Sequence, residues 1–156
     1  MKKLMSFFFV ALVALFCINC KTTMPVQVQS SADVPDLTEQ DYKNIDTQKT
    51  VTGIYFYNGR LGAAHVEMGD MTLKAFKDVM DGKVKFYKIN LTTFSPEGQR
   101  HVADKVIGEP TLPSYIFIYK NNILAKKVGG YDNRESATTA GEALYRGFQE
   151  KVWRKK

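Results

Sequence analysis

The chain has 156 residues and a formal net charge of +6, and its two cysteines, Cys17 and Cys20, both lie near the N-terminus. From Lys21 onward it is long enough for one domain with a hydrophobic core but too short for two. Because that part has no cysteine and only two scattered histidines, we expect no disulfide, no thiolate or histidine-rich metal site and no bound cofactor.

The N-terminal segment is typical of an export signal. Two lysines follow Met1, and the apolar run from Leu4 to Ile18 is too short to span a bilayer stably. Cys20 closes this run, and the sequence becomes polar immediately after it. This arrangement resembles the lipobox of bacterial lipoproteins, although Cys17 and Asn19 stand where that family usually has Leu and a small residue. The resemblance implies that Cys20 becomes the lipidated first residue of the mature protein.

An ordinary cleaved signal and an uncleaved anchor are the alternatives, and all three place the remaining chain outside the cytoplasm. The lipid would hold the protein to a membrane of the cell envelope, on the periplasmic face or the cell surface. We expect a signal peptide over 1–19, a lipidated cysteine with a flexible tether over 20–35, and one domain over 36–156. The basic end of the chain, Arg154 to Lys156, is best explained as a solvated helix end, and we expect no nucleic-acid partner.

The first half of the domain has the pattern of a strand, a helix and a second strand. After a short helical turn near 36–40, an apolar run over 51–57 predicts a strand, and residues 63–80 predict a helix after a loop. Asp81-Gly82 ends that helix, and residues 84–91 predict the next strand. A strand, a helix and a strand in this order form a crossover with parallel strands.

The second half predicts a shorter helix, a hairpin and a long final helix. Ser95-Pro96-Glu97 supplies an N-cap, a first-turn proline and an acidic residue for a helix that ends near Val106. Residues 113–119 predict a central strand, which Asn121-Asn122 joins in a tight hairpin to a strand over 123–128. Asp132 and Glu135 have the spacing of a capping box for a helix that reaches about Trp153. Its apolar face consists of Ala140, Leu144, Phe148 and Val152.

In this order of elements the chain resembles the thioredoxin family. Three passages carry the resemblance: residues 84–90 before the middle helix, Pro113 at the start of the hairpin strand, and Lys127-Val128-Gly129 at the end of the hairpin. The resemblance covers about 36–153. It implies an α/β, three-layer fold with a mixed central sheet flanked by helices and a cis peptide before Pro113.

The departures from the family concern its chemistry. Thioredoxins have Cys-Gly-Pro-Cys at the start of the helix after the first central strand, whereas this chain has Leu61, Gly62, Ala63 and Ala64. Leucine and alanine can neither attack a disulfide nor resolve a mixed one. The buried aspartate of the family corresponds to Tyr55, although Lys88 is retained. We therefore expect that the protein does not catalyse dithiol exchange.

Other catalytic groups are sparse. His65 lies near Glu67 at the start of the predicted helix, and Ser114 beside Pro113 is the best available nucleophile. A lone histidine near a helix start is more often a surface residue, and Glu67 with Asp70 reads as a solvated acidic face rather than a metal site. We expect His101, on the middle helix, to be a surface residue as well.

The resemblance also implies a shallow groove that docks extended polypeptide. It would be formed by the loops around the degenerate motif, the cis-proline and the start of the last helix. These loops contribute Arg60, Leu61, His65, Leu112, Pro113 and Gly130. We expect a non-catalytic module that binds an envelope protein or peptide there. The alternatives are an accessory to an envelope thiol–disulfide oxidoreductase, and a former active site that Leu61 and Ala64 simply fill while binding occurs elsewhere.

Overall fold

The computed structural model describes residues 26–109 and 111–154, which form a four-stranded mixed sheet with the strand order β2-β1-β3-β4. The central strand β1, Val51–Tyr57, runs parallel to β2, Val84–Asn90, and antiparallel to β3, Ser114–Tyr119. Strand β4, Asn122–Val128, completes the hairpin with β3. The predicted signal, Cys20 and the first part of the predicted tether lie outside the described residues.

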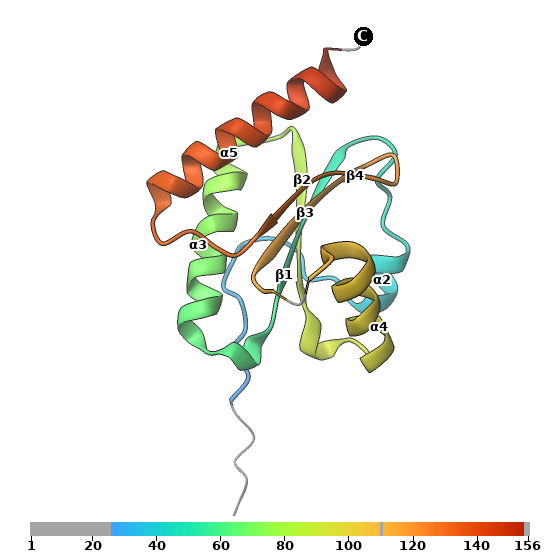
Figure 1. The fold of residues 1–156 in the computed structure, drawn as a ribbon, viewed down its shortest axis with the longest axis vertical. Helices are drawn as coiled ribbons and strands as arrows, with labels where there is room; N and C mark the ends of the chain where they lie inside the picture. The colour runs from blue at the N-terminus through green and yellow to red at the C-terminus, as the bar shows by residue number, and fades with distance from the viewer. Residues whose placement is uncertain (1–25, 110, 155–156) are drawn as a thin grey trace, which may run out of the picture.

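Helices cover both faces of the sheet, so the expected three-layer fold is confirmed (Figure 1). Helices α3, Ala63–Val79, and α5, Arg134–Phe148, lie on one face, and α2, Glu39–Lys43, and α4, Pro96–His101, lie on the other. Short 3-10 helices, Gly59–Leu61 and Leu91–Thr93, follow β1 and β2. The last turns of α4 and α5 widen into π-helical segments, Val102–Ile107 and Gln149–Trp153.

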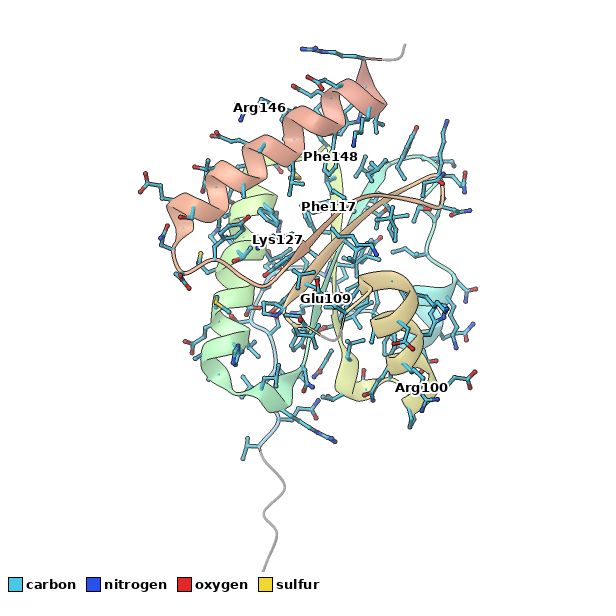
Figure 2. All side chains as sticks on the ribbon, in the orientation of Figure 1. Arg100, Glu109, Phe117, Lys127, Arg146 and Phe148 are labelled. Carbon is cyan, nitrogen blue, oxygen red and sulfur yellow. The ribbon has the colours of Figure 1, made fainter. Side chains whose placement is uncertain are left out.

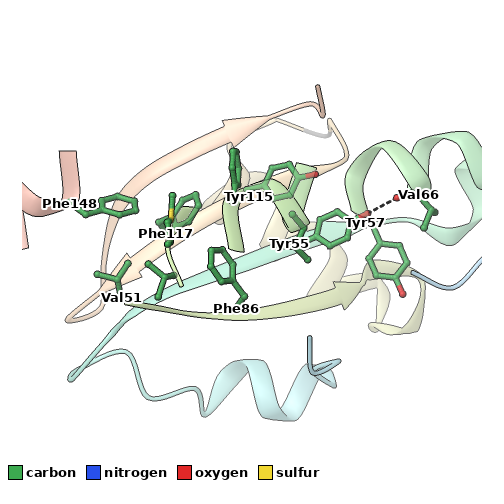
Figure 3. Close-up of a cluster of buried hydrophobic side chains, with 12 residues drawn as sticks. Val51, Tyr55, Tyr57, Val66, Phe86, Tyr115, Phe117 and Phe148 are labelled. Atoms are coloured by element: carbon green, nitrogen blue, oxygen red, sulfur yellow. Dashed lines mark hydrogen bonds between the residues drawn. The ribbon is translucent and has the colours of Figure 1, made fainter. Parts of the chain in front are cut away.

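Strand β1 is buried along its whole length because it lies inside the sheet and has helices on both sides. Successive side chains alternate between the two faces. Tyr55 and Tyr57 belong to the cluster beneath α3 and α5, which Figure 3 shows, and Ile54 and Phe56 belong to the cluster beneath α2 and α4. The continuous apolar run over 51–57 is thus explained by two cores that share one strand.

Helix α5 packs through the apolar face predicted for it. Phe148 is buried, and Ala140, Leu144 and Val152 are half-buried against the same cluster. Figure 2 shows Phe148 from α5 and Phe117 from β3 meeting between the helix and the sheet, with ring centroids 5.2 Å apart, whereas Arg146 lies on the outside.

The N-cap of α5 and the hairpin turn each lie one residue away from where the sequence predicted them. The N-cap of α5 is Asn133 rather than Asp132, because the Asn133 side chain accepts the Ser136 amide at 2.9 Å. In the hairpin, the residues with positive φ are Lys120 and Asn121, not Asn121 and Asn122. Thr47 fixes this turn: its carbonyl accepts the Lys120 amide at 2.8 Å, and its hydroxyl donates to the Asn121 side chain at 2.8 Å.

The segment predicted as a tether is packed against the domain from Val28 onward, earlier than the expected start near residue 36. Residues 28–34, which we call the strap, run beside α3 and the end of β1 (Figure 1). Asp36 then pairs with Lys88 in a parallel bridge along β2. Hydrogen bonds to residues far away in the sequence hold the strap there. It is therefore packed although its sequence has no helical or strand periodicity.

The opposite edge of the sheet is β4. Its pairing with β3 shifts register between Phe117 and Ile118, and Lys126 and Lys127 are adjacent on it. The Nζ atoms of these lysines donate to the Ile107 and Val128 carbonyls at 3.2 and 2.7 Å. None of the helices within 26–109 and 111–154 combines the length and the apolarity needed to cross a membrane.

Candidate functional site

Residues 61–64, where the resemblance placed Cys-Gly-Pro-Cys, lie at the junction between a 3-10 turn and α3. Asn58 caps the turn by accepting the Arg60 amide at 2.9 Å, and the Leu61 amide donates to the Asn58 carbonyl at 3.1 Å. Gly62 then has a φ of 95°, which glycine adopts without strain, and it is the N-cap of α3. Helix α3 then begins at Ala63.

The side chains at this junction face solvent. Leu61 is 47% exposed, which is high for a large apolar residue. Arg60, Ala63, Ala64 and His65 are exposed as well. Neither Leu61 nor Ala64 is therefore buried in the core.

The cis-proline loop and the loop before α5 are joined to each other. The Leu112–Pro113 peptide is cis, as the resemblance implied. The Pro113 carbonyl accepts the Gly129 amide at 2.8 Å, and Ser114 donates to the Thr111 carbonyl at 2.6 Å. Among the described residues, neither the N–H nor the carbonyl of Leu112 makes a hydrogen bond.

Met68 connects these loops to the start of α3. A Cβ atom at Gly130 would lie 2.7 Å from Cγ of Met68, so the absence of a side chain at Gly130 allows the loop to approach the helix closely. Ala64 is one helical turn before Met68 and lies on the same face of α3. Of the six residues of the predicted groove, Arg60, Leu61 and His65 are exposed, Leu112 and Gly130 are half-buried, and Pro113 is buried. The approach of Gly130 to Met68 brings the loop before α5 against the helix that begins after Leu61.

Beneath this surface, Tyr55 occupies the position where the resemblance placed an aspartate. Tyr55 is fully buried and stacks between Tyr57 and Tyr115, with ring centroids 5.3 and 5.2 Å apart (Figure 3). Its hydroxyl donates to the Val66 carbonyl at 3.4 Å. Burial is the main reason that the pKa of Tyr55 lies far above its usual range, so this hydroxyl stays protonated. Gly69 makes room for it, because a Cβ atom there would overlap the Tyr55 hydroxyl.

Lys88 is next to Tyr55 in the parallel ladder and is only 7% exposed. Its ammonium donates to the Ser30 and Ala32 carbonyls at 3.0 and 2.7 Å and lies 3.6 Å from the Asp36 carboxylate. A buried ammonium needs such partners. All three partners belong to the N-terminal segment, at Ser30, Ala32 and Asp36.

Asp70 has a different role from the one expected for it. It is half-buried, and its carboxylate accepts hydrogen bonds from the Ser30 hydroxyl at 2.5 Å, the Ser31 amide at 2.7 Å and the Ser31 hydroxyl at 3.0 Å. The predicted solvated acidic pair was therefore wrong for Asp70, although Glu67 is exposed. The sequence signal was the Ser30-Ser31 pair, whose partner lies too far along the chain to be identified from spacing.

The remaining catalytic candidates are not arranged as a catalytic site. Ser114 is fully buried, and its hydroxyl is engaged by the Thr111 carbonyl, so it cannot act as a surface nucleophile. His65 and His101 are exposed. Within the residues that the structure describes, no three His, Cys, Asp or Glu side chains gather closely enough to hold a metal ion.

A cavity of about 670 Å³ that the sequence did not predict lies on the other face of the sheet, between α2, α4 and the hairpin turn. Tyr42, Phe94 and Ile118 contribute apolar side chains to it, and Glu39 lies at its rim. The hydrogen bond from Lys43, followed by those from the Ser95 amide and hydroxyl, lowers the pKa of Glu39 to about 2.

Neither a family model nor a curated protein matches this sequence. Solved structures do match. The fold is thioredoxin-like. The germline-specific thioredoxin Deadhead from Drosophila melanogaster is 23% identical, with a TM-score of 0.50 over 71% of this chain and 98% of that one. Mitochondrial thioredoxin 3 from Saccharomyces cerevisiae, in its oxidized form, is 17% identical, with a TM-score of 0.51 over 75% of this chain and 94% of that one.

A third match comes from the structure that describes thiol resolution in yeast mitochondrial 1-Cys peroxiredoxin via the glutathione and thioredoxin systems. It is 18% identical, with a TM-score of 0.51 over 78% of this chain and 99% of that one. Likeness at these identities concerns the arrangement of the backbone. Function depends on the side chains that this chain presents on that backbone.

Proposed function

We propose that the protein is a non-catalytic, thioredoxin-like lipoprotein of the cell envelope that binds a protein or peptide partner through the groove. The groove is the surface around Arg60, Leu61, His65, Leu112 and Gly130, at which Pro113 is buried. The observation that carries the proposal is the backbone of Leu112, whose N–H and carbonyl have no hydrogen-bond partner among the described residues. An extended peptide can pair with such groups as an added strand.

Leu61 gives this surface an apolar contact. A single exposed leucine is common on protein surfaces and by itself indicates little. Here, however, it stands just before α3, and the loop that bonds to Pro113 through the Gly129 amide reaches the same helix at Met68. A docked peptide would cover the Leu61 side chain while its backbone pairs with Leu112. Specificity would then come from the side chains that meet Leu61, Arg60 and His65.

Two features support a function without thiol chemistry. The sequence has no cysteine after Cys20, so a dithiol cannot form in the domain. The interior beneath the motif is occupied by the Tyr57–Tyr55–Tyr115 stack, in which burial raises the pKa of Tyr55 and of Tyr115 far above the usual range. A group that stays protonated cannot assist proton transfer as a base.

The binding proposal is tested by crosslinking and affinity capture from envelope extract with the full chain carrying a C-terminal tag. A groove variant, Leu61→Asp with His65→Glu, should lose the partner. The matched control is Ile123→Asp with His101→Glu, which makes the same two changes at exposed positions elsewhere, since Ile123 is 41% exposed. Equal capture by both variants would contradict binding through the groove.

The nature of the captured partner separates the two proposed roles. A partner that contains its own Cys-x-x-Cys motif would favour the accessory role in an envelope oxidoreductase system, and any other partner would favour a simple binding module. Insulin reduction by the purified protein above the uncatalysed rate would contradict both, because it would demonstrate thiol chemistry in the chain itself.

Anchoring through Cys20 is tested separately. The variant Cys20→Ser should move from the membrane fraction to the soluble fraction, and mass spectrometry of the native N-terminal peptide should show acyl chains. A native protein that begins at another residue without lipid would contradict the lipoprotein proposal and leave groove binding unaffected.

A further inference from the structure

The strap, residues 28–34, contacts the loop that carries Leu61. The Val28 amide donates to the Gly59 carbonyl at 2.9 Å, and Gly59 is the first residue of the 3-10 turn that ends at Leu61. Gly59 is buried, and a Cβ atom there would overlap the Val28 carbonyl oxygen. The glycine at this position therefore permits the strap to lie directly against the loop.

Asp70 and Tyr57 hold the middle of the strap. The three hydrogen bonds that Asp70 accepts all come from Ser30 and Ser31. Tyr57, at the end of β1, donates its hydroxyl to the Gln29 side chain at 2.9 Å and accepts the Ser30 amide at 3.3 Å. Hydrogen bonds to a carboxylate are among the stronger ones in proteins.

Lys88 and Lys77 also bond to the strap. Its ammonium donates to two strap carbonyls, those of Ser30 and Ala32, and Lys77 on α3 donates to the Asp33 carbonyl at 2.7 Å. The strap is thus bonded to the loop, to β1, to β2 and to α3, which are the elements that position the N-terminal side of the groove.

Most residues of the strap lie near the surface, although its hydrogen bonds to Tyr57 and Lys88 are buried. Ser30 is its only buried residue, and its apolar residues Val28, Ala32 and Val34 are half-buried. Segments with few buried apolar contacts open at a smaller free-energy cost than the core. Opening of the strap would therefore cost less free energy than unfolding of the sheet and helices.

We infer that the strap is a detachable clamp that regulates the groove: when seated on Asp70 and Lys88 it fixes the loop 58–62, and when released it loosens this loop and weakens partner binding. The effect on binding rests on the proposed function, whereas the effect on the loop does not. Because the strap continues the N-terminal part of the chain, a force or a partner that acts on those earlier residues would reach the loop through it.

The test is hydrogen–deuterium exchange with mass spectrometry on the full chain in mild detergent. Asp70→Ala removes three hydrogen bonds to the strap, and Asp78→Ala is the matched control on the same helix, where the carboxylate pairs with Arg134 and Lys74 instead. We expect exchange in 28–34 to rise on the order of tenfold in Asp70→Ala, with a parallel rise in 58–62. Neither segment should change in Asp78→Ala.

A second variant distinguishes release of the strap from general unfolding caused by a substitution in α3. Ser30→Ala with Ser31→Ala removes the two hydroxyl donors from the strap itself without touching α3, and it should reproduce the same paired increase to a smaller degree. Faster exchange in 28–34 with unchanged exchange in 58–62, in either variant, would overturn the inference. Coupled exchange of strap and loop combined with unaffected capture by the groove variant would retain the clamp but disprove the proposed groove.

Discussion

The surface around Leu61 and Leu112, which we propose as the rim of a binding groove, and the interior near it are built in opposite ways. At the rim, Leu61 is half-exposed and the backbone of Leu112 is unpaired among the described residues. In the interior, Tyr55 is fully buried in a stack, and the buried ammonium of Lys88 has several partners. The difference separates two roles: the interior stabilises the fold, and the rim is available for contact.

The packing of Tyr55 and Lys88 depends on residues far apart in the sequence. Gly69 leaves the space that the Tyr55 hydroxyl occupies, and Lys88 lies next to Tyr55 in the parallel ladder. The strap supplies carbonyl groups to the Lys88 ammonium. Several distant positions therefore fit one another.

The largest effect is expected in the interior, for Tyr55→Ala. Removing a fully buried aromatic side chain from the stack should lower the free energy of unfolding by about 3–5 kcal/mol, as measured by urea denaturation. Tyr55→Phe should cost far less, because the hydrogen bond of the hydroxyl is long, at 3.4 Å. A small loss for Tyr55→Ala would mean that the interior is not the stabilising region.

Gly59→Ala tests the boundary between the two regions. Its Cβ atom would overlap the Val28 carbonyl, so either the strap or the loop must move, at a cost of about 1–3 kcal/mol. Thermal denaturation measures the loss. Gly147→Ala is the control, since a Cβ atom there meets nothing within 4 Å and α5 should gain up to about 1 kcal/mol. Equal behaviour of the two variants would show that the strap does not press on the loop.

The pH dependence of stability tests the other face of the sheet, where Glu39 lies beside α2 and α4. The pKa of Glu39 in the folded protein, about 2, lies below the ordinary 4.5, so its contribution to stability is complete above pH 4.5 and is lost as the pH falls toward 2. Urea denaturation across this range should show a smaller fall in stability for Glu39→Gln than for the native chain. Identical pH profiles would mean that the contacts with Lys43 and Ser95 do not persist in solution.

The smallest effect on stability is expected at the rim. Leu61→Asp should change the free energy of unfolding by no more than about 0.5 kcal/mol, because the side chain is largely in solvent and the residue lies outside the packed clusters. The same change should abolish capture of the partner. A marked loss of stability would instead assign Leu61 to the fold and remove the contrast between rim and interior.

The main elements could be predicted from the sequence because their signals are local. The apolar run of β1, the cap and proline at Ser95-Pro96 and the spacing of Ala140, Leu144 and Phe148 each depend on residues near one another in the chain, and the structure has a strand or helix at each. The displaced hairpin turn shows the limit of such signals. Asn121-Asn122 indicated a turn, but Thr47, far away in the sequence, determines which residues adopt positive φ.

The strap could not be predicted for the same reason. Residues 28–34 have no periodic pattern, and their partners Gly59, Asp70 and Lys88 are recognisable only when the fold has brought them together. The Ser30-Ser31 pair was compatible with a solvated linker. Of the candidate site, the sequence indicated the position of Leu61 and the cis-proline, but it did not reveal that the loop is bonded to the N-terminal segment.

Strand β4 forms an edge of the sheet, and its features affect how copies of the protein behave at high concentration. A sheet edge with regular, unpaired backbone groups is a template on which strands of neighbouring chains can assemble and aggregate. Here the shift after Phe117 interrupts the regular pleat, Lys126 and Lys127 add like charges, and Lys127 covers the Val128 carbonyl with its own ammonium. Even at high density, neighbouring copies would meet at an edge that disfavours a shared sheet, so the molecules can stay separate.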